Sequence, residues 1–190
     1  MAAYSLWAFA PRLAGSEFGM YALIAAVYLP GGGIALSGLL RGERRVARFH
    51  AIFVPGFLLY ATAWSGVWFA LPTVAGEWLA SLAGTHAFAA FAWARMGRPG
   101  GFWKASIPLF VLHSAGYFAG EFVGYSLFRG GWNGMETSTA KTMGKLAWGC
   151  LHGLGFGAGI GWLFHGWQPT EGNVPAMDAA NQPPGPTTSI

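Results

Sequence analysis

Residues 49–71 read FHAIFVPGFLLYATAWSGVWFAL, a continuous apolar stretch that contains no Asp, Glu, Lys or Arg. A membrane-spanning α-helix needs about 20 predominantly apolar residues to cross roughly 30 Å of hydrocarbon. Stretches of the same character occur at residues 18–40, 78–94, 105–128 and 146–167. The sequence therefore predicts an all-α fold, a polytopic membrane helix bundle of about five transmembrane helices within residues 1–167.

Composition supports a chain that faces lipid. Of its 190 residues, 54% are hydrophobic and 9% are charged, whereas soluble domains carry about 25% charged residues. So few charges cannot cover a water-facing surface, and the length suits a single domain. The lipid bilayer is thus the first expected partner. The net charge of +4 is explained by basic loops rather than by a nucleic-acid partner.

Basic residues predict the orientation in the cell (inner) membrane. Arg41, Arg44, Arg45 and Arg48 precede the second span, and a second basic group follows the third span: Arg95, Arg98 and Lys104. Both groups fall on one side of the membrane. The positive-inside rule places that side in the cytoplasm. The N-terminus is then expected outside and the C-terminus inside.

The composition changes after the last span. Residues 168–190 are rich in proline and contain few apolar residues. Such a segment cannot bury enough apolar surface to fold by itself. The sequence predicts that this tail is disordered, or that it is held by a partner.

Two spans carry glycines at four-residue spacing, a glycine-zipper pattern. Residues so spaced lie on one face of a helix, and small residues there let another backbone approach closely, which favours helix association in lipid. The fifth span also carries Gly155 and Gly159 on a second face. The stripes predict contact between the fourth and fifth spans, or with another subunit or a flat cofactor ring. The residues of the two stripes are Gly116, Gly120 and Gly124, and Gly149, Gly153, Gly157 and Gly161.

The first span contains the run Pro30-Gly31-Gly32-Gly33. Proline removes one hydrogen bond of a helix, and the three glycines weaken the next turn. The run predicts a helix break at membrane depth, which transporters use to bind ions or substrates. A simple kink or an irregular span end would explain the same residues.

Four ionisable residues lie deep in the predicted spans, where such residues are costly and usually face the protein interior. The spacing places Glu121 of the fourth span and His152 of the fifth at a similar depth. His113, Tyr117 and Glu121 are four residues apart and form one polar line on the fourth span. The deep ionisable residues are His86, His113, Glu121 and His152.

Three chemistries could use these residues. His86, His113 and His152 could ligate a b-type haem or the magnesium of a chlorin. Glu121 and His152 could share a proton in a relay. A metal site for hydrolysis or oxidation would need three or more convergent ligands, and the local spacing typical of such sites is missing from the sequence. Histidines that only tie helices together are the structural alternative.

The sequence favours a membrane subunit of a larger assembly, with other membrane subunits as partners and a haem or chlorin as the cofactor to be tested. A small transporter or proton-coupled carrier is the alternative; it would use the predicted break at Pro30 and the Glu121–His152 pair. A membrane-embedded enzyme is the third alternative. No catalytic residues are predicted, because the chain has neither a nucleotide-binding loop nor a Gly-x-Ser-x-Gly nucleophile elbow.

Overall fold

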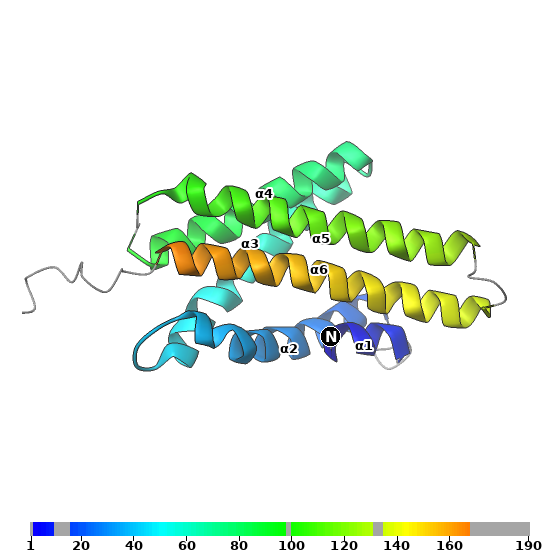
Figure 1. Ribbon diagram of the computed structural model, residues 1–190, viewed down its shortest axis with the longest axis horizontal. Helices are drawn as coiled ribbons and strands as arrows, with labels where there is room; N and C mark the ends of the chain where they lie inside the picture. Colours follow the sequence, from blue (N-terminus) through cyan, green and yellow to red (C-terminus); the bar gives the residue numbers. More distant parts are fainter. Residues whose placement is uncertain (1, 10–15, 98–99, 131–134, 168–190) are drawn as a thin grey trace, which may run out of the picture.

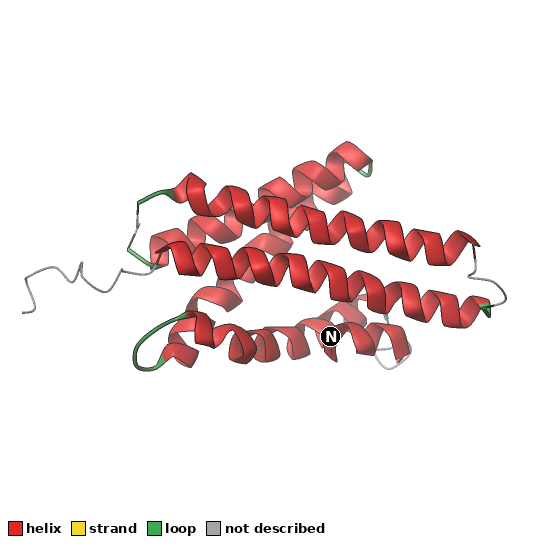
Figure 2. Ribbon diagram, in the orientation of Figure 1, coloured by secondary structure: helices red, strands yellow, loops and turns green. Residues whose placement is uncertain are grey.

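The computed structural model describes residues 2–9, 16–97, 100–130 and 135–167, and all regular structure in these ranges is helical (Figures 1 and 2). The predicted all-α class is confirmed for this part of the chain. The tail at 168–190 lies outside the described residues. The elements are α1 (Ala2–Phe9), α2 (Glu17–Leu36), the 3-10 turn η1 (Ser37–Leu39), α3 (Arg45–Ala70), α4 (Val74–Arg95), α5 (Phe102–Gly130) and α6 (Thr137–Trp167).

Helix starts and turns are determined by local chemistry. The side chains of Ser16 and Thr73 accept hydrogen bonds from the backbone N–H groups of Gly19 and Gly76, at 3.0 and 3.1 Å. Such caps satisfy donors that a helix start leaves unpaired. Gly76 also allows the tight turn between α3 and α4, because a Cβ at this position would collide with the backbone carbonyl of Leu71.

The helix α2 differs from the predicted break. It runs from Glu17 to Leu36 with Pro30 in its interior, since one proline removes only one backbone hydrogen bond. The glycines after Pro30 have a packing role instead. A Cβ at Gly32 would lie 3.4 Å from the ring of Phe53, and one at Gly33 would collide with the imidazole of His50. The run therefore lets α3 approach α2.

Helices α5 and α6 lie side by side and run antiparallel (Figure 1). α6 begins at Thr137, well before the predicted start at 146, so part of the predicted loop is helical. Two stretches of the described residues are long and apolar enough to cross a membrane by length and composition, Ala22–Leu39 and Arg45–Ala70. Helices α5 and α6 together contain more glycine, serine and histidine than α3, which lowers their hydropathy.

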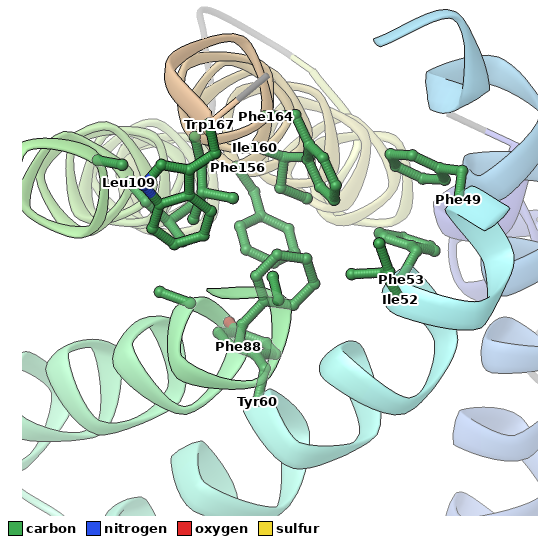
Figure 3. Close-up of a cluster of buried hydrophobic side chains, with 14 of the residues drawn as sticks. Phe49, Ile52, Phe53, Tyr60, Phe88, Leu109, Phe156, Ile160, Phe164 and Trp167 are labelled. Atoms are coloured by element: carbon green, nitrogen blue, oxygen red, sulfur yellow. The ribbon is translucent and has the colours of Figure 1, made fainter. Parts of the chain in front are cut away.

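The core is an aromatic cluster between α3, α4, α5 and α6 (Figure 3). The rings of Phe49 and Phe164 lie 5.0 Å apart, and Phe88 contacts Phe53 and Phe156 edge-on at 6.3 and 6.0 Å. These side chains are almost completely buried. The cluster thus holds four helices together at one end of the bundle.

Candidate functional site

Three polar side chains meet in the interior of the bundle. The hydroxyl of Tyr60 on α3 lies 2.6 Å from Nε2 of His113 on α5. The same nitrogen lies 3.2 Å from Nε2 of His152 on α6. Tyr60 is 6% exposed, His113 is fully buried and His152 is 9% exposed. We call these three residues the Tyr-His-His cluster.

Close contact between α5 and α6 brings the two imidazoles together. A Cβ at Gly116 would lie 2.5 Å from the carbonyl oxygen of Leu151 and 2.9 Å from Cα of Gly155. His113 and His152 each lie three residues before one of these glycines, on antiparallel helices. The glycine contact thus fixes the separation of the two imidazoles.

The glycines of the two stripes do not all serve this contact. Gly116 and Gly120 of α5 lie against α6, where a Cβ at Gly120 would come within about 3 Å of Trp148. On α6 the contact uses the second face, Gly155 and Gly159. A Cβ at Gly153 or Gly157 would meet nothing within 4 Å. Within this chain, the contact predicted through Gly153 and Gly157 is therefore replaced by one through Gly155 and Gly159.

The remaining stripe positions are less tightly packed. A Cβ at Gly124 would lie 3.7 Å from the carbonyl oxygen of Gly144, which is ordinary contact, and one at Gly161 would lie 3.9 Å from Leu39. Gly149 is buried in α6. Close backbone approach is thus concentrated in the middle of the α5–α6 interface, at the level of the two histidines.

The shared nitrogen of His113 determines what the Tyr-His-His cluster can do. Nε2 of His113 is within hydrogen-bonding distance of both Tyr60 and His152. In neutral His113 this nitrogen either donates its proton or accepts with its lone pair. The other ring nitrogen, Nδ1, is buried without a hydrogen-bond partner among the described residues. When the two imidazoles together carry one positive charge, each Nδ1 is protonated and the third N–H lies between the Nε2 atoms, bonded to one and accepted by the other.

Aromatic rings surround the two imidazoles. The ring of His152 lies 4.9 Å from that of Trp148, and that of His113 lies 5.4 Å from Phe156. Tyr117 is within 6.3 Å of both histidine rings. The two imidazoles thus lie in a largely aromatic and apolar environment, and burial of this kind disfavours a charged form.

The same geometry disagrees with a haem held between His113 and His152. Bis-histidine ligation places the nitrogens on opposite sides of the metal, about 4 Å apart with metal–nitrogen bonds of about 2.0–2.1 Å. The two Nε2 atoms are 3.2 Å apart and in direct contact. In this arrangement no flat ring fits between them.

Glu121 has a neighbour that was not predicted. The carboxyl groups of Glu121 on α5 and Glu77 in the first turn of α4 are hydrogen-bonding neighbours, and Tyr117 lies close to both. Ionised carboxylates only accept hydrogen bonds, so a bond between two carboxyls requires a proton on at least one. The predicted neighbour of Glu121 was His152, at a similar depth on α6.

The Tyr-His-His cluster lies between a polar and an apolar half of the bundle. The polar half contains Tyr117 and the carboxyl groups of Glu77 and Glu121. Four buried polar atoms of the cluster and of this half have no hydrogen-bond partner among the described residues. These atoms are Trp64 Nε1, Ser81 Oγ, His113 Nδ1 and Ser114 Oγ. On the other side lies the aromatic cluster of Figure 3, with Phe88, Phe156 and Phe164 at its centre. Two further buried atoms of this kind, Ser106 Oγ and Trp167 Nε1, lie on the side of the aromatic cluster, whereas the two carboxyls lie on the other side.

The third predicted ligand, His86, lies apart from this cluster. It is half-buried on α4, and its Nδ1 donates to the carbonyl of Leu82 at 2.9 Å. Its aromatic neighbours are Phe102, Trp103 and Phe110 on α5. The structure therefore brings His113 and His152 together and leaves His86 on a different face.

Two functional candidates, Tyr60 and Glu77, were not predicted. Tyr60 carries a hydroxyl in an otherwise apolar part of α3, which is the only sequence signal for it. Glu77 comes four residues after the N-cap Thr73, and an acidic residue in the first turn of a helix is ordinarily explained by the helix dipole.

Comparison of the chain with protein-family models, with curated proteins and with solved structures gives no match in any of the three.

Proposed function

We propose that this chain is a proton-coupled carrier that spans the membrane five times, with its N-terminus outside and its C-terminus in the cytoplasm. Two stretches have the length and apolarity of spans, Ala22–Leu39 and Arg45–Ala70. Helices α3, α4, α5 and α6 form one bundle, in which α4 packs on α3, α5 on α4 and α6 on α5, and they present large apolar side chains outward. Phe69, Phe122 and Leu154 are 65–75% exposed, as lipid-facing residues would be.

The observation that carries the proposal is the contact between His113 and His152 at 3.2 Å, where the polar half of the bundle ends. Transfer of a proton breaks an N–H bond on one imidazole and forms one on the other, and the positive charge moves with it. Histidine suits this role because a neutral imidazole carries one donor nitrogen and one acceptor nitrogen. Ionisable groups inside a membrane bundle are typical of proton pathways.

The asymmetry of the bundle supports a carrier rather than an open channel. Glu77, Glu121 and Tyr117 place carboxyl and hydroxyl groups toward one end. Phe88, Phe156 and Phe164 close the other end with buried rings. A site that is accessible from one side at a time is what alternating access requires.

Proton movement can be measured in liposomes that hold the purified full chain and a pH-sensitive dye. An imposed pH gradient should collapse faster with the wild-type chain than with His113→Asn or His152→Asn. The matched control is His165→Asn, which changes an exposed histidine at the end of α6. Equal rates for the wild type and both interior variants would contradict the proposal.

A second candidate is a subunit of a larger membrane assembly. It is favoured by Gly153 and Gly157, which form a small face of α6 that nothing in the described chain covers within 4 Å. Small residues are enriched where membrane helices associate. If this face binds another subunit, Gly153→Leu should release the chain from its complex on a native gel while its own fold stays intact. An unchanged migration would exclude this face as the contact.

A further inference from the structure

His86 presents an imidazole nitrogen away from the core of the bundle. Its Nδ1 lies 2.9 Å from the carbonyl oxygen of Leu82, one turn earlier in α4. A carbonyl can only accept, so Nδ1 carries the proton and Nε2 carries the lone pair. Among the described residues, Nε2 has no hydrogen-bond partner. Histidines that bind metals commonly show this pattern, in which the second nitrogen donates to a carbonyl and fixes the tautomer.

His50 provides an internal comparison. Its Nδ1 lies 2.8 Å from the carbonyl oxygen of Val46, the same bond one turn earlier in α3. Its ring, however, lies against Gly33 of α2, so closely that a Cβ there would collide with it. Nε2 of His50 therefore faces a neighbouring helix backbone. The ring of His86 is half-buried like that of His50, but its ring neighbours are Phe102, Trp103 and Phe110 of α5.

The surroundings of His86 are aromatic and apolar. Its ring lies 5.7 Å from Trp103, 6.3 Å from Phe110 and 6.4 Å from Phe102, all on α5. Large apolar side chains extend this face of α4 and α5 outward and are 40–63% exposed. They are Leu79, Leu82, Trp103 and Ile107.

The chemistry restricts what His86 could bind. No group of three or more His, Cys, Asp or Glu side chains able to hold a metal occurs in the described ranges. A bare metal ion would therefore find a single protein ligand here, whereas protein sites normally supply three or four. A metal that arrives inside a tetrapyrrole already has four nitrogen ligands and needs one axial ligand. The flat, apolar ring of a tetrapyrrole also matches the aromatic face around His86.

We infer that Nε2 of His86 is the single axial ligand of a metallotetrapyrrole that lies on the outer face of α4 and α5. The planar ring covers Trp103 and the exposed apolar side chains beside it. His86 lies near the middle of α4, at the depth where lipid offers no hydrogen-bond donor for its lone pair. This inference rests on the five-span arrangement of the proposed function, but not on the proton-carrying role of His113 and His152, because neither residue takes part.

A titration of the purified full chain in detergent with haem tests the inference. The wild type should shift the haem absorption band to that of a species with one histidine ligand. His86→Gly should weaken binding at least tenfold, and added imidazole should restore the shifted band by replacing the missing side chain. His165→Gly is the matched control and should bind like the wild type.

Zinc protoporphyrin serves as a second probe, since its fluorescence responds to one axial nitrogen and its metal has the same open position as that of a magnesium chlorin. Circular dichroism checks that His86→Gly is folded. The inference is overturned if neither probe binds the wild type, or if folded His86→Gly binds both as tightly as the wild type. It is also overturned if imidazole has no effect on the variant.

Discussion

His113 and His152 face each other across the α5–α6 interface with their Nε2 atoms 3.2 Å apart, and the glycines that set this separation lie one turn away. Gly116 and Gly155 leave the two backbones in direct contact. The distance between the imidazoles is thus a property of helix packing. Any change that separates the helices should also separate the histidines.

Gly116→Ala should destabilise the chain by about 1–3 kcal/mol, because the new Cβ would overpack the contact with Leu151 and Gly155. Gly153→Ala is the matched change on the other face of α6, where a Cβ meets nothing within 4 Å. It should be neutral or stabilise the helix by up to about 1 kcal/mol. Thermal unfolding in detergent measures both. A larger loss for Gly153→Ala would mean that the two faces of α6 are misassigned.

Tyr60→Phe should lower stability by about 1 kcal/mol, since it removes one hydrogen bond from the buried nitrogen of His113. The same change should slow proton movement in liposomes, because the hydroxyl lies 2.6 Å from that nitrogen. Leu58→Ala is the control, because it changes an outward-facing residue of the same helix, 53% exposed, and should leave the rate unchanged. If Tyr60→Phe moves protons at the wild-type rate, Tyr60 has no part in proton transfer.

Stability should fall as the pH rises through the range in which the Glu77–Glu121 pair loses its last proton. The bond between two carboxyls exists only while one of them is protonated, and two adjacent carboxylates repel each other. Glu121→Gln keeps a donor for Glu77 at every pH and should remove this pH dependence. Unfolding temperatures measured against pH for the wild type and the variant provide the check. An identical pH profile in both proteins would mean that the two carboxyls do not interact.

Reporter fusions test the orientation. A reporter active only in the cytoplasm should work at the C-terminus and in the loop that holds Arg41 and Arg44, and fail between α5 and α6. The expectation rests on the excess of basic residues in the loops before α3 and between α4 and α5. The opposite pattern would invert the chain, and the polar end of the bundle would then face the cytoplasm.

The sequence predicted helix positions better than helix rotations. Apolar stretches located α3, α4 and α5 well, because burial in lipid or protein imposes a continuous pattern. The neighbour of Glu121 could not be predicted, since it depends on how α4 is turned toward α5. Gly153 and Gly155 illustrate the same difficulty. Both belong to glycine patterns on α6, and only packing against α5 decides which of the two faces is used.

The helix α2 shows why local rules alone were insufficient. Pro30 and three glycines predict a break when they are considered as a helix segment. In the structure, Phe53 and His50 occupy the space that the glycines leave, so tertiary contact compensates for weak helix propensity. Tyr60 was missed for a related reason, because its partner is distant in the sequence.

The central claim is that His113 and His152 share a proton, and nitrogen NMR of the full chain in lipid bilayers tests it most directly. With histidine labelled by ¹⁵N, the two Nε2 nuclei should show a coupling across the hydrogen bond, and the coupled signals should be lost in His152→Asn. The signals of His86 and His165 serve as uncoupled references in the same spectrum. The absence of any coupling between Nε2 nuclei, with His113 and His152 titrating independently of each other, would contradict the account.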